Sequence, residues 1–459
     1  MRHRVKSILF VLLVSAYLLP IGYLIAGVLG TSPSWTFEGS AQNEALGESV
    51  TMGDVNGDGV VDLIVGSPYR TGSTPFPHTG EVLIFLGAAA GPATTPSQVL
   101  VSTNPGFASA VVALGDFNGD SYGDVAVSST FNQFDQVEIY FGSPLGLSSS
   151  PGWSTTQDSI SFGQSLGAAG DVNGDGYADL LVGSPNYNTS SFTAGGRAYL
   201  FLGGPAAPTT PAWTFDGDAT AAVFGAALAA AGDVNRDGYG DVIVSEPGWQ
   251  GQQGIQGKAL VFLGIRGGLS ATPVWTNTGP INSTYGSAVG SAGDVNGDGY
   301  DDIVVGDNQA SVGVKRGSTT GLHRGKAYVY YGSASGPSKV AAWTATGQQD
   351  DDWLGDAVAS GDFNRDGFSD LIVSAPHEPQ LNPLPGQIYL FLGSAKGLGK
   401  SAAWTIQGGQ PGAGKAGFTL AVGDTTRDAL RDLLVGMPGW NTAAGSNVGR
   451  AVLFLGGAN

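Results

Sequence analysis

The chain contains no cysteine, so neither a disulfide nor a thiolate metal site can stabilise its fold. Basic residues are also scarce: 20 Lys and Arg stand against 38 Asp and Glu, which gives a formal net charge of −18. A surface of this sign repels phosphate, so nucleic acid is excluded as an expected partner. Only 4 histidines occur, and no Ser-His-Asp, HExxH or phosphate-loop pattern is present. We therefore expect no catalytic residues, and we expect core packing and bound ions to take the place of disulfides.

Glycine and apolar residues, by contrast, are abundant. The 75 Gly residues and the hydrophobic content of 42% are typical of a folded, turn-rich protein rather than a disordered one. Few segments have a helical pattern, so the composition favours a fold built from strands and turns.

The N-terminus has the features of a targeting segment. Arg2, Arg4 and Lys6 precede the uncharged run from Ile8 to Gly30, which at 23 residues is long enough to cross a bilayer. A cleavable signal usually has a shorter apolar core of about 7 to 15 residues. Residues 1–31 are therefore predicted to be either a signal peptide or an uncleaved N-terminal membrane anchor. In both cases the rest of the chain is exported, so we expect an extracytoplasmic protein, secreted or held at the membrane only by this segment.

An acidic segment of the form D-x-N-x-D-G-x-x-D recurs along the chain. Its copy at Gly170 to Leu180 reads GDVNGDGYADL. Consecutive copies are separated by 55 to 68 residues, a period typical of stacked supersecondary units rather than of separate domains. The first aspartates of the seven copies are Asp54, Asp116, Asp171, Asp233, Asp294, Asp362 and Asp424.

Each repeat contains four short segments with strand character. A Gly- and Ala-rich segment such as Ala226 to Gly232 precedes the acidic segment, and an apolar run such as Leu180 to Pro185 follows one. A second apolar run such as Gly196 to Gly203 and a Trp-Thr-Phe segment at Trp213 complete the unit. Runs without a polar face need cover on both sides, which a closed ring of stacked sheets provides. The sequence therefore predicts an all-β fold for residues 32–459: a seven-bladed β-propeller of four-stranded antiparallel blades, with the small residues at its centre.

The two ends of the chain predict how the ring closes. The last repeat stops after its third strand, Ala451 to Leu455, while the chain opens with an unattached strand, Trp35 to Phe37. We expect this N-terminal strand to complete the seventh blade, because a bare strand edge would invite aggregation.

The acidic segment has the donor set of a calcium loop. Oxygens at positions 1, 3, 5 and 9 and the backbone carbonyl at position 7 can converge on one point if the loop coils, and Gly at position 6 permits the left-handed backbone that coiling requires. Calcium prefers six to eight hard oxygen ligands at about 2.3 to 2.6 Å. A hydrated Asx-turn is the alternative, but crowded carboxylates would be costly without a cation. We expect about five to six Ca²⁺ sites. The predicted ligands are Asp54, Asn56, Asp58, Val60 and Asp62; Asp116, Asn118, Asp120, Tyr122 and Asp124; Asp171, Asn173, Asp175, Tyr177 and Asp179; Asp233, Asn235, Asp237, Tyr239 and Asp241; Asp294, Asn296, Asp298, Tyr300 and Asp302; and Asp362, Asn364, Asp366, Phe368 and Asp370.

Two details limit this interpretation. Position 12 is Val in all seven copies, whereas an EF-hand needs a bidentate Glu there, so the loop is a β-hairpin loop and not an EF-hand. The seventh copy has Thr426 in place of Asn and Ala429 in place of Gly, so Asp424, Asp428 and Asp432 are left out of the predicted set.

With these residues laid out, the chain resembles the FG-GAP repeat family, best known from the propeller of integrin α subunits. Phe162-Gly163 with Gly183-Ser-Pro185, and Phe224-Gly225 with Ser245-Glu-Pro247, match the segments for which the family is named. The resemblance runs from about Trp35 to the C-terminus. It implies that the calcium loops lie on one face of the propeller and that ligands or partners bind the opposite face. Since no integrin leg domains follow in this sequence, we expect a monomeric propeller rather than an integrin-like heterodimer.

The partner on the opposite face is predicted to be a protein or a glycan. The loop from Asp307 to Gly325 carries basic residues, and the loop from Gln348 to Trp353 is acidic, so the two either pair with each other or form a recognition patch. In the second case Trp249, Trp353 and Trp440 would be exposed aromatic anchors. We expect a protein-binding or adhesion module; the alternatives are a calcium-stabilised lectin and, less favoured, a polysaccharide lyase or hydrolase.

Overall fold

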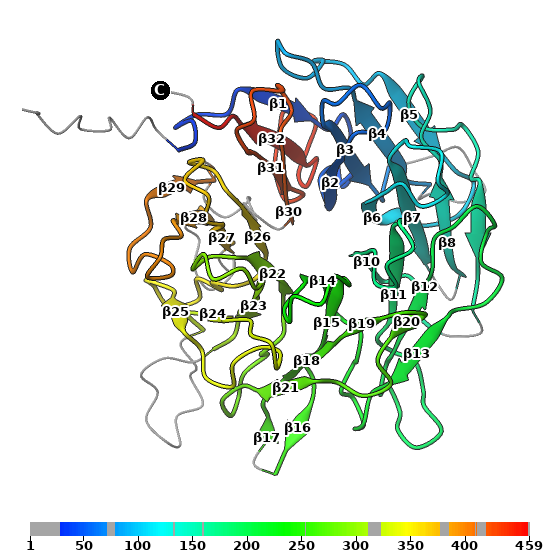
Figure 1. Ribbon diagram of the computed structural model, residues 1–459. Coiled ribbons are helices and arrows are strands. Elements are labelled where there is room, and N and C mark those ends of the chain that lie inside the picture. Colours follow the sequence, from blue (N-terminus) through cyan, green and yellow to red (C-terminus); the bar gives the residue numbers. More distant parts are fainter. Residues whose placement is uncertain are drawn as a thin grey trace, which may run out of the picture.

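The computed structural model describes residues 28–70, 79–131, 134–157, 160–252, 254–310, 323–376, 385–408, 410 and 419–457. In these ranges the regular secondary structure is entirely β, and seven four-stranded antiparallel sheets are arranged as blades around a central axis (Figure 1). The predicted β-propeller is confirmed. Most of the predicted targeting segment, residues 1–27, lies outside the described residues. No helix in the described part of the chain is long and apolar enough to span a membrane.

The strands of each blade follow one another from the centre outward. Blade 1 consists of β2 (Ser49–Gly53), β3 (Asp62–Ser67), β4 (Glu81–Phe85) and β5 (Gln98–Val101); blade 2 of β6 (Phe107–Gly115), β7 (Asp124–Phe131), β8 (Phe134–Tyr140) and β9 (Trp153–Thr155); blade 3 of β10 (Ser165–Gly170), β11 (Asp179–Ser184), β12 (Arg197–Phe201) and β13 (Trp213–Asp216); blade 4 of β14 (Leu228–Gly232), β15 (Asp241–Glu246), β18 (Lys258–Phe262) and β21 (Trp275–Thr278); blade 5 of β22 (Val289–Gly293), β23 (Asp302–Asp307), β24 (Lys326–Tyr330) and β25 (Trp343–Thr346); blade 6 of β26 (Val358–Gly361), β27 (Asp370–Ala375), β28 (Gln387–Phe391) and β29 (Trp404–Gln407); and blade 7 of β30 (Thr419–Gly423), β31 (Asp432–Met437), β32 (Arg450–Phe454) and β1 (Trp35–Glu38). Two short ribbons, β16 (Gln250–Gly251) with β17 (Gly254–Ile255) and β19 (Gly264–Ile265) with β20 (Gly268–Leu269), project from blade 4.

The innermost strands carry small residues because neighbouring blades converge there. A Cβ atom placed on Gly167 in β10 would lie only 2.8 Å from the carbonyl oxygen of Leu228 in the next blade. The second strands of six blades are buried throughout, as in β11 and β15, and β7 is buried except at its last two residues, because each is covered by a blade on both sides. This explains why their sequences are continuous apolar runs without alternation.

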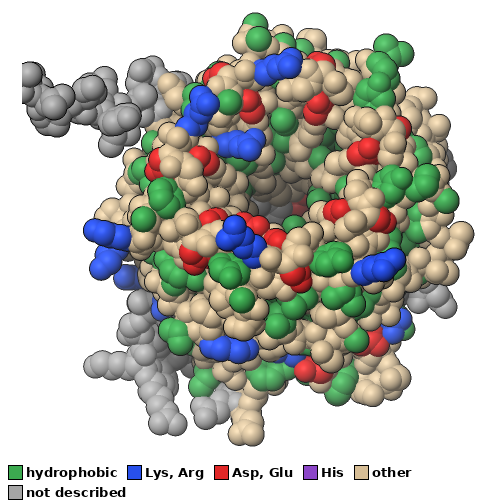
Figure 2. All heavy atoms as spheres, in the orientation of Figure 1, with side chains coloured by type: hydrophobic (Ala, Val, Ile, Leu, Met, Phe, Trp, Pro, Cys, Tyr) green, Lys and Arg blue, Asp and Glu red, His purple; other side chains and the backbone are tan. Residues whose placement is uncertain are grey.

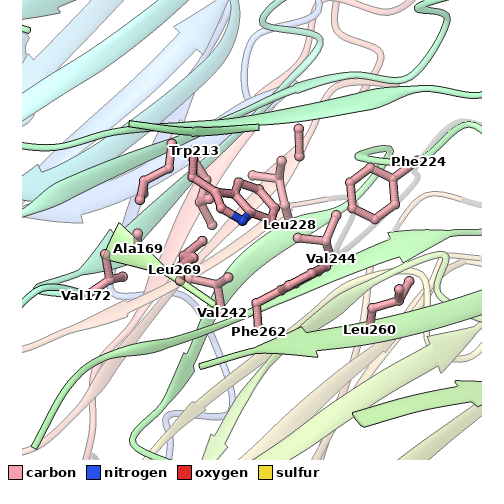
Figure 3. Packing of buried hydrophobic residues seen from close by; sticks show 13 residues of the cluster. Ala169, Val172, Trp213, Phe224, Leu228, Val242, Val244, Leu260, Phe262 and Leu269 are labelled. Carbon is pink, nitrogen blue, oxygen red and sulfur yellow. The ribbon is translucent and has the colours of Figure 1, made fainter. Parts of the chain in front are cut away.

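The hydrophobic core is divided among the junctions between blades. The cluster between blades 3 and 4, for example, joins Trp213 of β13 to Leu228 and Phe262 of the neighbouring blade (Figure 3). The ring centroids of Trp213 and Phe262 lie 5.0 Å apart at 71°, an edge-to-face contact. Equivalent clusters occupy the other junctions, so each blade buries its apolar faces only against its two neighbours.

Strand β1 closes the ring, as the sequence predicted. It pairs antiparallel with β32, placing Trp35 opposite Leu453, so that the first and the last strand of the described chain lie side by side in blade 7 (Figure 1). The contacts begin before β1: Leu29 forms a bridge with Gly456 and, like Val28, is buried in the core between blades 6 and 7. The last residues of the predicted targeting segment 1–31 therefore pack into the propeller.

Hydrogen bonds join the outer strand of one blade to the segment that precedes the outer strand of the next. The indole N–H of Trp213 donates to the carbonyl of Ser270 in the next blade, 3.2 Å away. The same bond is made by five other tryptophans at the start of fourth strands: Trp35 to Ala93, Trp153 to Pro208, Trp275 to Ser338, Trp343 to Gly399 and Trp404 to Gly30. Tryptophan is thus used at this position both to fill the core and to bond the next blade.

Candidate metal loops and the opposite face

The acidic segments form the loops between first and second strands, all on one face of the ring. In blade 3, Asp171 accepts hydrogen bonds from the backbone N–H groups of Gly174, Asp175 and Gly176, at 2.7, 3.1 and 2.8 Å. Asn173 Oδ1 accepts from Asp175 N at 3.1 Å, and Asp175 Oδ1 accepts from Tyr177 N at 3.1 Å. These bonds coil the loop, and Asn173 Nδ2 reaches Asp175 Oδ2 at 2.8 Å. The structure therefore brings the predicted ligands at positions 1, 3 and 5 together.

The same pattern recurs in blades 1, 2, 4, 5 and 6. In each, the Asn amide at position 3 donates to the Asp at position 5, and the Asp at position 1 accepts from the N–H of position 6. Blade 7 keeps the bonds to Asp424 and Asp428. Its Thr426 hydroxyl, however, is buried without a hydrogen-bond partner, so this side chain does not take over the role of the missing Asn.

The backbone of the loop is left-handed at two positions, of which only position 6 was predicted from the sequence. At position 6 the φ angle ranges from 66° at Ala429 to 90° at Gly238. Position 4 is also left-handed, with φ of 73° at Gly174, and of 58°, 58° and 59° where Arg236, Arg365 and Arg427 stand instead. A non-glycine residue in this region carries strain. Glycine at position 4 in four of the seven copies was the signal that could have revealed this.

The carboxylate at position 9 has both oxygens engaged by the blade itself. In blade 3, Asp179 is fully buried and accepts from Val172 N and from Gly203 N, both at 2.9 Å. Burial raises the pKa of Asp179 to about 7, because desolvation of the carboxylate outweighs these two hydrogen bonds. The six other blades repeat the pair of bonds, at Asp62, Asp124, Asp241, Asp302, Asp370 and Asp432. Position 9 thus ties the loop to the end of the third strand.

The donor set fits a hard cation in its chemistry, although the acids are not clustered. Among the described residues no group of three or more His, Cys, Asp or Glu side chains is close enough to hold a metal ion by itself. In blade 3, hydrogen bonds draw together the carboxylates at positions 1 and 5 and the Asn amide at position 3, while the carboxylate at position 9 is bonded to Val172 N and Gly203 N. Carboxylate and amide oxygens of this kind are calcium ligands. On the face shown in Figure 2, Asp and Glu side chains lie around a central hollow, with Lys and Arg side chains among them.

Neighbouring loops are linked across the junctions between blades. The N–H of Gly240, at position 8 in blade 4, donates to the carbonyl of Asp171, at position 1 in blade 3, at 2.9 Å. The same bond joins Val61 to Asp424, Gly123 to Asp54, Ala178 to Asp116, Asp301 to Asp233 and Ser369 to Asp294. Side chains add to the link, because the ring of Tyr239 at position 7 would lie 2.9 Å from a Cβ atom placed on Gly174. Position 7, predicted only as a carbonyl ligand, thus also packs on the preceding loop.

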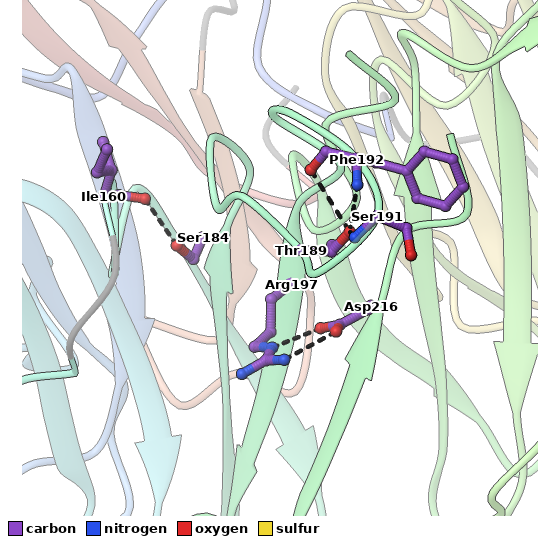
Figure 4. A network of polar contacts seen from close by, with 7 residues as sticks. All are labelled: Ile160, Ser184, Thr189, Ser191, Phe192, Arg197 and Asp216. Atoms are coloured by element: carbon purple, nitrogen blue, oxygen red, sulfur yellow. Dashed lines mark hydrogen bonds and ion pairs between the residues drawn. The ribbon is translucent and has the colours of Figure 1, made fainter. Parts of the chain in front are cut away.

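On the opposite face, cations are paired with carboxylates of their own blade. Arg197 Nη2 lies 2.8 Å from Asp216 Oδ2, with the guanidinium 4.1 Å above the ring of Tyr187 (Figure 4). Lys258 is buried between Glu246 and Asp218. Near blades 3 and 4, Arg197 and Lys258 are therefore both held in ion pairs.

The predicted recognition patch on this face is only partly as expected. Arg324 pairs with Asp350 at 2.8 Å and His323 lies 3.4 Å from Asp351, so the two loops pair with each other where they are described. Lys315 and Arg316 lie outside the described residues. The prediction of exposed tryptophan anchors is wrong. Trp249, Trp353 and Trp440 are all half-buried; the indole of Trp249 donates to Asp218, and the ring of Trp440 lies under Arg450.

A cavity of about 580 Å³ opens on the same opposite face, where blades 1, 2 and 3 meet. Tyr69 and Ile160, at its rim, are 43% and 52% exposed. Asp135 Oδ2 accepts from Ser161 N at 2.7 Å, and burial raises the pKa of this carboxyl. The cavity is lined by Glu48, Pro68, Tyr69, Ser109, Thr130, Phe131, Asp135, Ile160, Ser161 and Gln164. No sequence pattern indicates this cavity, because its residues come from three repeats.

The repeats match a known family. The FG-GAP repeat family matches residues 46–85, 162–201, 224–262, 285–330 and 354–391, which belong to blades 1, 3, 4, 5 and 6. This chain is an FG-GAP repeat protein. Outside these matches, blade 2 of the FG-GAP propeller carries Ala108 and Ser121 at left-handed positions where blades 1, 3, 4, 5 and 6 have Gly, with φ of 67° and 74°.

The FG-GAP propeller is similar to integrin α chains over part of its length. It is 38% identical to Integrin alpha-IIb of Mus musculus over 214 residues, which are 44% of this chain and 20% of that one. It is 36% identical to Integrin alpha-8 of Mus musculus over 162 residues, covering 32% of this chain and 15% of the other. The aligned regions thus span a fifth or less of the length of these two relatives.

A solved structure supports the fold alone. The crystal structure of BBS1N in complex with ARL6DN superposes with a TM-score of 0.50 at 12% identity, covering 94% of this chain and 97% of the other.

Proposed function

We propose that this FG-GAP propeller is an extracytoplasmic, calcium-binding module that binds a protein ligand and acts in adhesion. The observation that carries the proposal is the combination of an integrin-α-like ring with a repeated, coiled, acidic loop on one face and a carboxylate-lined cavity on the other. The N-terminal basic and apolar segment supports export.

The loops of blades 1 to 6 are the proposed calcium sites. In blade 3 the cation would be held by Asp171, Asn173 and Asp175, with the carbonyl of Tyr177 and with Asp179, whose oxygens have further lone pairs beside the two N–H bonds. When bound, calcium supplies positive charge that relieves the repulsion among these carboxylates. The carbonyl of Asp171 is bonded to the next blade, so a stiffened loop also stiffens the junction between blades.

Calcium binding is tested directly with the purified full chain. Equilibrium dialysis against ⁴⁵Ca²⁺ should detect several ions per chain, and removal of calcium with excess EGTA should lower the melting temperature substantially. A ligand that binds only the folded state stabilises it by mass action. No uptake at saturating calcium, together with an unchanged melting temperature in EGTA, would overturn the proposal.

The cavity on the opposite face is the proposed ligand site. It combines two carboxylates, Glu48 and Asp135, with apolar walls from Tyr69, Phe131 and Ile160, and no Lys, Arg or His occurs among the ten described residues that line it. A basic side chain of a protein partner fits this lining, since its methylene stem can pack on the apolar walls while its charge meets the carboxylates.

Peptide and glycan arrays distinguish this proposal from a lectin. We expect the full chain to bind peptides that contain Lys or Arg and to lose this binding when the basic residue is replaced by Gln. Asp135→Asn should weaken binding, whereas Asp216→Asn, a carboxylate outside the cavity that is paired with Arg197, should not. Selective binding to one sugar class with no binding to basic peptides would overturn the protein-ligand proposal in favour of the lectin.

A further inference from the structure

Two arginines reach from one acidic loop into the loop of the next blade. Arg427, at position 4 in blade 7, donates from Nη1 to the carbonyl oxygen of Asp58, at position 5 in blade 1, at 3.2 Å. A Cβ atom placed on Gly59 would lie 3.5 Å from the guanidinium carbon of Arg427. Arg236, at position 4 in blade 4, lies against Gly299 in blade 5 in the same way, since a Cβ atom there would be 2.5 Å from its Nη1.

The loops that follow a glycine at position 4 have a neutral neighbour instead. Gly57, Gly119, Gly174 and Gly297 are each covered by an aromatic ring from position 7 of the next blade, namely Tyr122, Tyr177, Tyr239 and Phe368. The loops of blades 2, 3, 4 and 6 therefore receive no guanidinium at this point, whereas those of blades 1 and 5 do.

Both arginines stand where the backbone favours glycine. Their φ values are 58° for Arg236 and 59° for Arg427, against 73° for Gly174 at the same position. Arg365, at position 4 in blade 6, has the same φ of 58°, but the loop that follows it, in blade 7, is not among the proposed calcium sites. A side chain at left-handed φ costs free energy, which an interaction with the next loop can offset. The guanidinium contacts with the acidic loop of the next blade supply one.

We propose that Arg427 and Arg236 act as internal counter-charges for the loops of blades 1 and 5. These two loops then bind calcium more weakly than the loops of blades 2, 3, 4 and 6, and depend on it less for their structure. The inference rests on the proposed calcium binding. Its physical basis is that a positive charge near a cation site offsets the repulsion among the carboxylates in the absence of the cation and opposes the cation when it arrives.

The test is calcium titration of the full chain by isothermal calorimetry. Arg427→Gln and Arg236→Gln should each tighten one class of sites by about five- to tenfold at low ionic strength, and should lower the melting temperature in EGTA. Arg427→Lys retains the charge and should resemble the wild type. Arg266→Gln removes the same charge from an exposed position outside the loops and serves as the matched control.

A double variant locates the effect. If Arg427 acts on blade 1, then Arg427→Gln should no longer change the titration once Asp58→Asn has disabled that loop, because the coupling between the two sites is then lost. One outcome would overturn the counter-charge role alone: the wild type takes up calcium, but the calcium titrations of Arg427→Gln and Arg236→Gln do not differ from that of Arg266→Gln. Absence of calcium uptake by the wild type would overturn the proposed function, and this inference with it.

Discussion

The side-chain amide of Gln98 donates to the carbonyl oxygen of Leu147 at 2.6 Å, joining the outer strand of blade 1 to blade 2. Gln98 lies opposite Ile84, the register position that Trp213 occupies opposite Leu200 in blade 3. The glutamine therefore makes the bond between blades that six tryptophans make elsewhere. Together the seven donors form a closed ring of hydrogen bonds near the rim of the propeller.

Removing one of these donors should weaken the ring. Gln98→Ala should lower the free energy of unfolding by about 1 kcal/mol, the usual contribution of one hydrogen bond. Trp275→Phe should lower the free energy of unfolding by more, about 1 to 3 kcal/mol, because the substitution removes the hydrogen bond and also replaces a packed indole by a smaller side chain. Urea denaturation of both variants measures this, and a Gln98→Ala variant as stable as the wild type would show that this bond does not contribute.

Leu29 should be part of the folded core although it lies in the predicted targeting segment. It is 1% exposed, so Leu29→Ala should destabilise the propeller by about 2 to 5 kcal/mol. Leu145, which is 91% exposed, provides the control: Leu145→Ala should change stability by less than about 0.5 kcal/mol. Equal melting temperatures for the two variants would argue against this packing.

Positions 5 and 9 of the loop should respond differently to calcium. Asp179→Asn turns an amide N–H toward a backbone donor, so it should cost about 1 to 3 kcal/mol both in calcium and in EGTA. Asp175→Ala, at an exposed position, should lower the melting temperature mainly in calcium. Asp428→Ala, in the loop of blade 7 that lacks the Asn, should do little in either buffer. Thermal unfolding of the three variants in both buffers checks this, and an Asp179→Asn effect confined to calcium would mean that position 9 serves only the metal.

Asp307 should give the propeller a measurable pH dependence. It is fully buried at the end of β23 and accepts a hydrogen bond from Thr284 N at 3.1 Å. The pKa of Asp307 is raised from 3.8 to about 6, because the effect of burial is larger than the opposing effects of hydrogen bonds and of the charge of Lys326. The other titratable groups that interact with it are Tyr285, Tyr328 and Tyr330.

The sign follows from the raised pKa in the folded state. The favourable contribution of Asp307 is fully present below its unfolded pKa of 3.8 and is lost as the pH rises through about 6. Between about pH 4 and pH 7 the wild type should therefore lose up to about 3 kcal/mol relative to Asp307→Asn. Denaturant unfolding of both proteins across this range measures the difference, and parallel pH profiles would contradict the shift.

The sequence by itself determined the architecture of this protein. A regular period, strands of apolar residues without alternation, small residues before each acidic segment and an unattached strand at Trp35 were enough to predict seven blades and their closure, because each of these features is local or repeats in phase. The convergence of Asp171, Asn173 and Asp175 could also be predicted, since it depends on residues within one turn of chain.

The contacts between repeats were decided only by the tertiary structure. The bond of Asp171 to the next blade, the reach of Arg427 into the loop of blade 1, the cavity shared by three blades and the burial of Trp249, Trp353 and Trp440 all depend on how blades lie beside one another. The residue pattern within one repeat does not predict how neighbouring blades contact each other. Side chains more than fifty residues apart meet because neighbouring blades pack against each other, and the free energy of their contacts is set by packing and desolvation in the assembled propeller.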